Sequence, residues 1–251
     1  MRKLILVLLF TPAFFQTFSY AGQMPLKIMS FNLHCLEDNW VKRLEIFAQE
    51  AARISPDIIS LQEVCTTETE NGIQFLKEKL MMAGYPLQEL RVQYTHKSWD
   101  KYYEHLVILT KNKIEYSKQG YLPPSPFLRG YVALKIKGKW FLNTHLEFLD
   151  GNYRTEEVKF LMNIFPSEQH VIMGDFNSSP TEEDLVLFHH AGYRSYFPGP
   201  TFPAHAPQTT IDGFWLSSNF AYSRADVIRF FQNEYAGTYL SDHFAVLISI
   251  Y

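Results

Sequence analysis

Val171-Ile172-Met173-Gly174-Asp175-Phe176-Asn177 is the stretch from which the organisation of this chain can be worked out. Three apolar residues lead into a glycine, which is followed by an aspartate and, two residues later, by an asparagine. A short apolar run of this kind predicts a buried strand that ends in side chains carrying oxygen atoms. Because side chains alternate along a strand, we expect Asp175 and Asn177 on the same side.

The same arrangement recurs at four other places in the chain. In each, an apolar run ends or begins at Asn, Glu, His or Asp. These places are Ile28-Met29-Ser30-Phe31-Asn32, Ile58-Ile59-Ser60-Leu61-Gln62-Glu63, Phe141-Leu142-Asn143-Thr144-His145 and Ser241-Asp242-His243. Five strand ends or starts that all carry polar side chains suggest that the strands share one site.

The composition limits the classes of protein to consider. Of the 251 residues, 47% are hydrophobic and 16% aromatic, which is enough for a large core. The formal net charge of −3 argues against a generally basic protein that coats DNA. It is compatible with an enzyme that makes few, local contacts with nucleic acid.

A leader is predicted at the N-terminus. Two basic residues precede a largely apolar run over residues 4–18, and Ser19-Tyr20-Ala21 offers small residues where a signal peptidase reads. We therefore expect residues 1–21 to be a signal peptide and the protein to be exported, either to a periplasm or into the medium. Residues 22–251 would form one catalytic domain with no stable membrane span. The alternative is an uncleaved anchor, although the run is short against a span of about 20 residues.

The two cysteines, Cys35 and Cys65, would lie in a compartment that allows disulfides if the protein is exported. Cys35 follows Asn32 by three residues and Cys65 follows Glu63 by two, so they meet if Asn32 and Glu63 share a site. A bridge would close a loop of about 30 residues and stabilise the fold by roughly 3–4 kcal/mol. Two buried free thiols are an equally open alternative.

Strand and helix patterns alternate in both halves of the chain. Strands are expected over residues 26–33, 57–64, 105–110, 131–136, 140–146, 170–176, 214–216 and 244–251, with at least one more between 85 and 104. Four helices are expected: one capped by Asp38 or Asn39 and stopped by Ser55-Pro56, one with Ile73 on its apolar face and Gly84 as its stop, one over 150–165, and one from Ser179-Pro180 to Gly192. This order predicts an α/β fold with two mainly mixed or antiparallel sheets packed face to face and helices outside.

The polar side chains at the strand ends suit a hard metal ion. Oxygen ligands are available from Asn32, Glu63, Asp175, Asn177 and Asp242. No cluster of Cys and His has the spacing of a zinc site. A set of carboxylates and amides suits Mg²⁺, with Mn²⁺ as a substitute, held by few protein ligands and completed by water and substrate phosphate.

Two histidines are candidates for proton transfer. His145 and His243 can each act as acid or base near neutral pH, and Glu104 and Asp212 are available to orient them. Arg129, just before a strand, could clamp a phosphate oxygen. Each motif alone is more often a turn, a helix cap or a structural residue. Their joint occurrence at five strand ends is what favours an active site.

Six motifs occur in order across essentially the whole chain after the leader. They are Ser30-Phe31-Asn32, Leu61-Gln62-Glu63-Val64, Asn143-Thr144-His145-Leu146, Gly174-Asp175-Phe176-Asn177, Thr210-Ile211-Asp212 and Ser241-Asp242-His243. In this order they resemble the endonuclease/exonuclease/phosphatase superfamily, which includes the pancreatic-type deoxyribonucleases and the neutral sphingomyelinases. The resemblance implies a four-layered α-β-β-α sandwich and metal-dependent cleavage of a phosphoester.

The resemblance also implies roles for the oxygen-bearing side chains. Glu63 would be the main metal ligand, with Asn32 and Asp242 beside it. Asp175 would orient the attacking nucleophile, and Asn177 would hold the phosphate. The reaction would be an in-line displacement in which charge on the phosphoryl oxygens is neutralised.

The histidines receive roles in the same way. His243, paired with Asp212, would help to activate the attacking water or would stabilise charge on the phosphate. His145, oriented by Glu104, would protonate the leaving oxygen or donate to the phosphate. The sequence does not decide which histidine is the base and which the acid.

The favoured function is that of a secreted, Mg²⁺-dependent phosphodiesterase, a monomer that acts as an endonuclease on nucleic acid. A sphingomyelinase-like phospholipase C is the alternative. Two observations keep it open. Cys65 stands where pancreatic-type deoxyribonucleases carry a phosphate-binding arginine, and an aromatic surface could contact phospholipid. That surface would comprise Trp99, Tyr102, Tyr103, Tyr121 and Phe127. A catalytically inactive member that binds a partner is a remote third alternative, since no signature position is lost.

Overall fold

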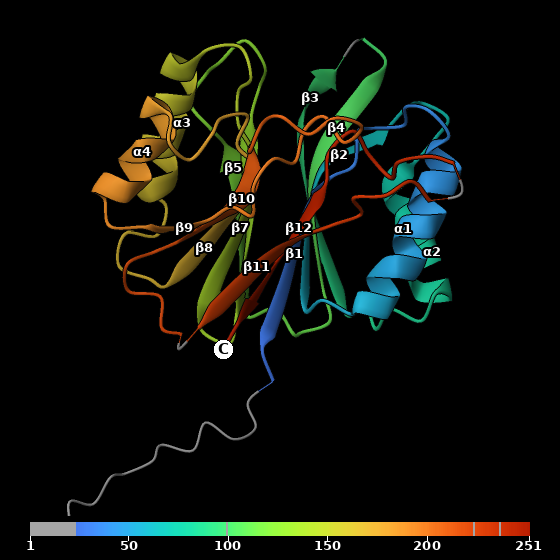
Figure 1. Ribbon diagram of the computed structural model, residues 1–251, viewed down its shortest axis with the longest axis horizontal. Helices are drawn as coiled ribbons and strands as arrows, with labels where there is room; N and C mark the ends of the chain where they lie inside the picture. Colours follow the sequence, from blue (N-terminus) through green and yellow to red (C-terminus); the bar gives the residue numbers. More distant parts are fainter. Residues whose placement is uncertain (1–23, 99, 223, 236) are drawn as a thin grey trace, which may run out of the picture.

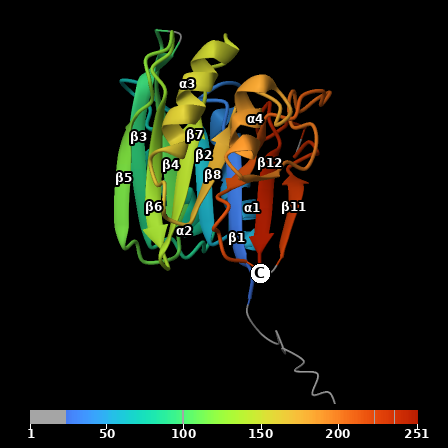
Figure 2. The ribbon, with the colours of Figure 1, turned by 90° about the vertical axis from the view of Figure 1, so that its left-hand side faces the viewer.

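The computed structural model describes residues 24–98, 100–222, 224–235 and 237–251, so the expected signal peptide and Trp99 lie outside the described residues. Two six-stranded sheets pack face to face, and helices cover the outer face of each (Figures 1 and 2). The predicted four-layered sandwich is confirmed. Both ends of the described chain lie at one end of the sandwich in Figure 1.

The first sheet has the strand order β11-β12-β1-β2-β4-β3. Its strands are β1 (Leu26–Asn32), β2 (Ile58–Thr66), β3 (Glu89–Ser98), β4 (Tyr102–Thr110), β11 (Ala225–Phe230) and β12 (Ala245–Ile250). β1 and β2 run parallel because α1 (Trp40–Ile54) crosses between them, whereas the neighbouring pairs are antiparallel. α1 and α2 (Gly72–Met82) lie on the outer face (Figure 1).

The second sheet has the order β5-β6-β7-β8-β10-β9. Its strands are β5 (Tyr116–Tyr121), β6 (Gly130–Ile136), β7 (Lys139–His145), β8 (His170–Asp175), β9 (Arg194–Tyr196) and β10 (Asp212–Leu216). β7 and β8 run parallel, connected through α3 (Gly151–Met162), which covers this sheet together with α4 (Glu183–His190) (Figure 2). In the described part of the chain, no helix has the length and apolar character needed to cross a membrane.

Aromatic side chains fill the layers between sheets and helices. Phe31 of β1 lies against Phe47 of α1, with ring centroids 5.5 Å apart, and both are fully buried. On the other side, Trp215 of β10 stacks on Phe188 of α4 at 4.8 Å. Full burial of such a side chain stabilises the fold by about 1.5–3 kcal/mol relative to exposure, so these layers hold the helices firmly on the sheets.

Between the two sheets, the inner faces change from apolar to polar along the strands. On β1, Ile28 lies in the core between the sheets, and the next residues on that face are Ser30 and Asn32. On β8, Met173 is followed on the inner face by Asp175. Period-2 alternation therefore gathers polar side chains at one end of the sandwich, and a site forms there.

The fourth helix is shorter than predicted. α4 begins at Glu183, not at Ser179-Pro180. The N–H of Glu182 donates to the backbone oxygen of Ser179 at 3.0 Å, so Pro180 occupies a turn that precedes the helix. The predicted end is correct, because the last helical residue is His190 and Gly192 has a φ of 83°.

Candidate active site

β8 ends at Asp175, which is 1% exposed and lies in the polar end of the sandwich. The preceding Gly174 allows the close packing of β8 on β7, since a Cβ there would lie 2.0 Å from the backbone oxygen of Thr144. Asn177 has a φ of 50°, so the chain is no longer extended and the predicted alternation with Asp175 is wrong. The two residues still touch, because the N–H of Asn177 donates to Asp175 Oδ1 at 2.9 Å.

Three side chains surround the other oxygen of Asp175, Oδ2. Asn32 Nδ2 donates to it at 3.0 Å, while the Nε2 atoms of His145 and His243 lie 3.6 and 3.7 Å away. Burial alone would raise the pKa of Asp175, but the charges of the two imidazoles outweigh it and lower that pKa. Asp175 is therefore an ionised acceptor between two potential proton donors.

His243 is held by Asp212, the first residue of β10. His243 Nδ1 lies 2.9 Å from Asp212 Oδ2, and Thr201 Oγ1 donates to the same oxygen at 2.5 Å. Burial lowers the pKa of His243, but the charges of Asp212 and Asp175 raise it to about 10. The ring is therefore positively charged at neutral pH.

His145, the last residue of β7, is held by Glu104 of β4 on the opposite sheet. His145 Nδ1 lies 3.2 Å from both Glu104 Oε1 and Arg129 Nη1. Because a guanidinium cannot accept a hydrogen bond, we assign Nδ1 of His145 as a donor whose N–H is directed at Glu104 Oε1. Burial would raise the pKa of Glu104, but the hydrogen bond and charge of His145, together with the charge of Arg129, lower it to about 2.

Arg129, expected as a phosphate clamp, lies behind the histidine. It is 3% exposed, and its Nη1 is 3.5 Å from Glu104 Oε1. The loop that precedes it is anchored by the fully buried Glu147, whose carboxylate accepts the N–H of Phe127 at 3.0 Å. The same carboxylate accepts the N–H of Phe148 at 2.8 Å. Arg129 is thus placed to fix His145 and Glu104.

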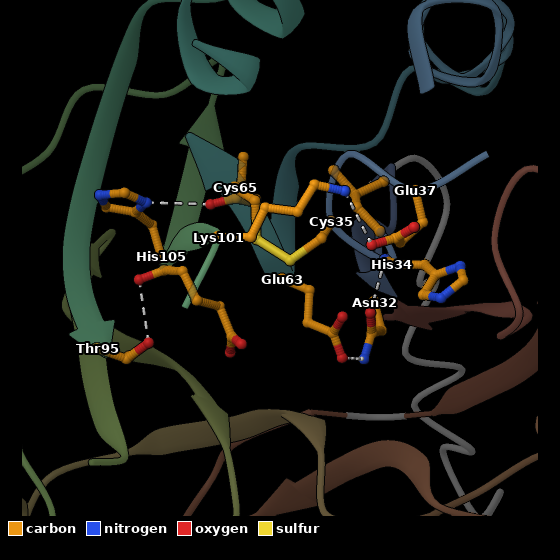
Figure 3. The surroundings of a disulfide bond; sticks show 12 residues. Asn32, His34, Cys35, Glu37, Glu63, Cys65, Thr95, Lys101 and His105 are labelled. Carbon is orange, nitrogen blue, oxygen red and sulfur yellow. Dashed lines mark hydrogen bonds and ion pairs between the residues drawn. A yellow bond between two sulfur atoms is a disulfide. The ribbon is translucent and has the colours of Figure 1, made fainter. Parts of the chain in front are cut away.

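Glu63 lies at a bulge in β2, where the pairing with β4 shifts between Leu61 and Val64. Asn32 Nδ2 donates to Glu63 Oε1 at 2.9 Å, and the two side chains lie together in Figure 3. The same Asn32 amide also binds Asp175, so it joins the two carboxylates. Burial and the charge of Glu104 raise the pKa of Glu63.

Asp242, predicted as a further ligand, lies at the edge of this group. Its side chain is 34% exposed, and Oδ1 lies 3.8 Å from His34 Nδ1. The charge of Asp242 also raises the pKa of Glu63, as expected of two neighbouring carboxylates. The structure therefore places Asn32 in contact with Glu63, and Asp242 close enough for its charge to act on Glu63.

This group fits a divalent cation. Burial is the largest cause of the raised pKa of Glu63, and the charges of Glu104 and Asp242, which a cation would neutralise, add to it. The oxygens of Glu63, Asp242 and Asn32 are the hard ligands that Mg²⁺ or Mn²⁺ prefers. Ligand atoms of Asp175, Asp212 and His243 also lie within 4.8 Å of one another. Because Asp212 and His243 already bind each other directly, we assign that trio to proton transfer instead.

Two residues without a predicted role join the sheets beneath the site. Gln62 Nε2 donates to Asn143 Oδ1 across the sandwich at 2.7 Å. Asn143 Nδ2 donates in turn to the backbone oxygen of Leu61 at 2.7 Å. Both side chains are fully buried on inner faces where an apolar residue is expected, and that break in the alternation was the available signal.

A disulfide joins Cys35, in the loop after β1, to Cys65 on β2 (Figure 3). Both residues are buried, and the bridge lies two residues from Glu63. The structure thus pairs the two cysteines, in line with the disulfide expectation and not with two free thiols. Gly72, at the start of α2, packs against the backbone of Cys65, since a Cβ there would lie 2.6 Å from its carbonyl oxygen.

The predicted aromatic surface is only partly exposed. Tyr102 is 1% exposed, contrary to expectation, because it packs in the small cluster around the disulfide. Tyr121 is exposed, whereas Tyr103 and Phe127 are half-buried. Beside the histidine and arginine, the exposed apolar side chains of the loops are Leu128, Phe148 and Leu149.

A comparison with protein families gives one match. The profile of the Endonuclease/Exonuclease/phosphatase family matches residues 29–243. This range contains the site residues from Asn32 to His243. A search of curated proteins gave no match.

Solved structures share the fold at low sequence identity. A family protein from Leptotrichia buccalis is 21% identical, with a TM-score of 0.76 over 90% of this chain and 99% of that one. A family protein from Bacteroides vulgatus is 16% identical, with a TM-score of 0.70 over 91% and 99%. TDP2 from Caenorhabditis elegans is 18% identical, with a TM-score of 0.67 over 90% and 75%. At these identities the likeness shows the fold alone.

Proposed function

The chain belongs to the endonuclease/exonuclease/phosphatase family, a family of phosphoester hydrolases, and we propose that it is an exported, metal-dependent phosphodiesterase that cleaves nucleic acid. One observation carries the phosphodiesterase proposal. Two histidines, each oriented by its own carboxylate, converge on Asp175 Oδ2 beside the Asn32–Glu63 pair.

The proposed reaction uses Asp175 and the two imidazoles around it. Ionised Asp175 orients the attacking water and accepts its proton. Positively charged His243 stabilises negative charge that builds on the phosphoryl oxygens, and His145 donates a proton to the leaving oxygen. Glu104 and Asp212 keep the Nε2 atoms directed at the substrate by holding Nδ1 of each ring.

A cation would be held by Glu63, with Asp242 and Asn32 beside it. When bound, the cation would neutralise the negative charge that builds on the phosphoryl oxygens. Asn32 has a second task in this arrangement, because its amide keeps Glu63 and Asp175 at a fixed spacing. The carboxylate that receives the cation and the carboxylate that orients water are thus coupled through one side chain.

The experiment compares two substrates on one protein. Residues 22–251 are purified and given supercoiled DNA or sphingomyelin vesicles, with Mg²⁺ or with EDTA, beside the His243→Ala variant. Nicking of DNA that both EDTA and the substitution abolish is the expected result. DNA cleavage that persists in EDTA, or in His243→Ala, would overturn the proposed site.

Phospholipid is the second candidate substrate, favoured by a specific observation. Leu128, Phe148 and Leu149 are 40%, 45% and 59% exposed on the two loops beside Arg129 and His145. An exposed apolar patch at the edge of a catalytic site can contact lipid. Release of phosphocholine without nicking of DNA would replace the nuclease proposal with a phospholipase C. If Glu63→Ala and His243→Ala both kept the protein's full biological activity, the nuclease and phospholipase proposals would both fail, and a catalytically inactive member that binds a partner would replace them.

A further inference from the structure

The backbone around the proposed cation site adopts unusual conformations. The ligand loop, residues 33–37, follows Asn32 and contains two consecutive residues with positive φ: His34 at 53° and Cys35 at 43°. Glu63 itself has a φ of 50°. Residues other than glycine rarely adopt this region, and they stay there only when surrounding structure holds them. The left-handed backbone of Glu63 therefore needs restraints from its surroundings.

The disulfide is one restraint on this backbone. It joins Cys35 to Cys65, two residues after Glu63 (Figure 3). The N–H of Cys35 also donates to the backbone oxygen of Glu63 at 3.2 Å. The bridge and this hydrogen bond close a short ring that runs from the carbonyl group of Glu63 through Val64 and Cys65 to Cys35. The covalent part of that ring keeps the hydrogen bond in reach.

Arg43 of α1 is a second, separate restraint on the ligand loop. Its side chain is 1% exposed, and its guanidinium donates to five backbone oxygens. These belong to Leu33 (2.8 Å), His34 (3.2 Å), Cys35 (3.2 Å), Glu37 (2.8 Å) and Leu240 (2.8 Å). The loop is therefore wrapped around a buried cation that does not depend on the disulfide.

From these contacts we infer that the Cys35–Cys65 disulfide is a positioning element for the cation site, which holds Glu63 in the conformation that receives the metal. The inference rests on the metal ligation proposed above. Without the bridge, Arg43 keeps the ligand loop folded, while the backbone of Glu63 is free to leave its left-handed conformation. Metal affinity falls, and the histidines, which other elements hold, keep their geometry.

The test measures metal binding directly. Residues 22–251 and the Cys35→Ala/Cys65→Ala variant are titrated with Mn²⁺, and free Mn²⁺ is followed by electron paramagnetic resonance. We expect Kd for Mn²⁺ to rise about tenfold in the variant, the size of effect typical of residues that orient metal ligands. Turnover at saturating Mn²⁺ should stay within about threefold of the parent, because the variant binds the metal more weakly but keeps the catalytic histidines in place.

Reduction supplies an independent arm. A dithiol such as dithiothreitol passes two electrons and two protons to the cysteine sulfurs and closes to its own cyclic disulfide. Where mass spectrometry shows the bridge to be open, Kd should shift as in the alanine variant. The alanine variant itself should not respond to dithiothreitol, because the chain contains no other cysteine.

A control separates positioning from general stability. Ile136 is the last residue of β6, at the end of the strand far from Arg129, and Ile136→Ala opens a cavity there. This variant should lower Tm without changing Kd for Mn²⁺. If the alanine variant of the disulfide lowers Tm but leaves Kd within twofold of the parent, the bridge only stabilises the fold and the inference fails. If the intact, oxidised protein binds no Mn²⁺, the metal in the proposed function fails instead.

Discussion

His145 and His243 direct their Nε2 atoms at the same carboxylate oxygen, Asp175 Oδ2, from 3.6 and 3.7 Å. The two rings come from different sheets, His145 from the end of β7 and His243 from the loop before β12. Both distances exceed the hydrogen-bond range, so neither Nε2 atom is bonded directly to Asp175. In the proposed reaction the two rings therefore serve different oxygens of the substrate, His145 the leaving oxygen and His243 the phosphoryl oxygens.

Replacing either histidine should reduce turnover strongly. We expect His145→Ala and His243→Ala each to lower kcat by about 10²-fold or more, because the first removes the proposed general acid and the second removes the positive charge beside the phosphoryl oxygens. His190→Ala, an exposed histidine on α4, is the matched control and should keep full turnover. Near-normal kcat in both site variants, measured at saturating substrate and Mg²⁺, would refute the assignment.

Glu63→Gln should weaken the dependence on metal. The amide keeps the size of the side chain and removes the charge, so the Mg²⁺ concentration for half-maximal activity should rise by about 10–100-fold. Glu70→Gln changes an exposed carboxylate nearby in the chain and should leave the Mg²⁺ titration unchanged. An unchanged titration for Glu63→Gln would mean that the cation binds elsewhere.

Glu157 of α3 should make the fold less stable as pH rises. Its side chain is fully buried, and burial raises its pKa from 4.5 to about 7. The folded state thus keeps a proton that the unfolded state loses, so the free energy of unfolding falls between about pH 4.5 and 7 and is level above that range. The total loss is at most about 3 kcal/mol.

The measurement for Glu157 is urea unfolding at several pH values in EDTA. Glu157→Gln, which cannot ionise, should lose this part of the pH dependence, so the difference from the parent grows as pH rises from 5 to 8. Glu156→Gln, an exposed neighbour, should keep the parent's profile. Parallel profiles for Glu157→Gln and the parent would show that Glu157 has the same pKa in both states.

The disulfide should stabilise the folded protein. Thiol titration of the unfolded, unreduced protein should find no free thiol, because Cys35 and Cys65 are paired. Opening the bridge should lower the free energy of unfolding by roughly 3–4 kcal/mol, since the closed loop restricts the unfolded chain. Two thiols per chain before reduction would contradict the pairing.

The N-terminus supplies a prediction about processing. Mass spectrometry of the exported protein should show a chain that begins at Gly22, because Ala21 ends the predicted signal peptide. The variant Ala21→Pro changes the residue before the cleavage point and should block cleavage after residue 21. An intact Met1 in exported, wild-type protein would show that residues 1–21 are retained.

The sequence predicted the central strands well because they obey a simple alternation. Ile28, Ser30 and Asn32 share one face of β1, so the course of the strand and the position of its polar end can both be read from the chain. Edge strands β5, β9 and β11 were missed. β5 is exposed along most of its length and pairs with β6 alone, so nothing selects an alternating pattern there.

The buried charged residues of the site region could not be predicted. Arg43 falls on the helix face with Phe47, yet its ligands are backbone oxygens of a loop whose course depends on the tertiary fold. Glu147 is buried because two loops meet over it, and Glu157, on α3, is buried beneath the same loops, where its carboxylate accepts the N–H of Glu147. The local sequence pattern shows which residues alternate along a strand or helix. The partners of these buried charged residues come from other segments of the chain, which the local pattern does not reveal.

The Gln62–Asn143 pair affects how the two halves of the sandwich can move. The disulfide and the backbone ladders act within a sheet, whereas this side-chain pair bridges from one sheet to the other just below the reacting groups. Apolar side chains resist separation of the sheets but allow one sheet to slide over the other. A hydrogen bond has a preferred length and direction, so it also resists sliding. The pair thereby sets the alignment of His145 and Glu104, which lie on opposite sheets. Changes in loops at the far end of the molecule can then accumulate without shifting the catalytic groups relative to one another.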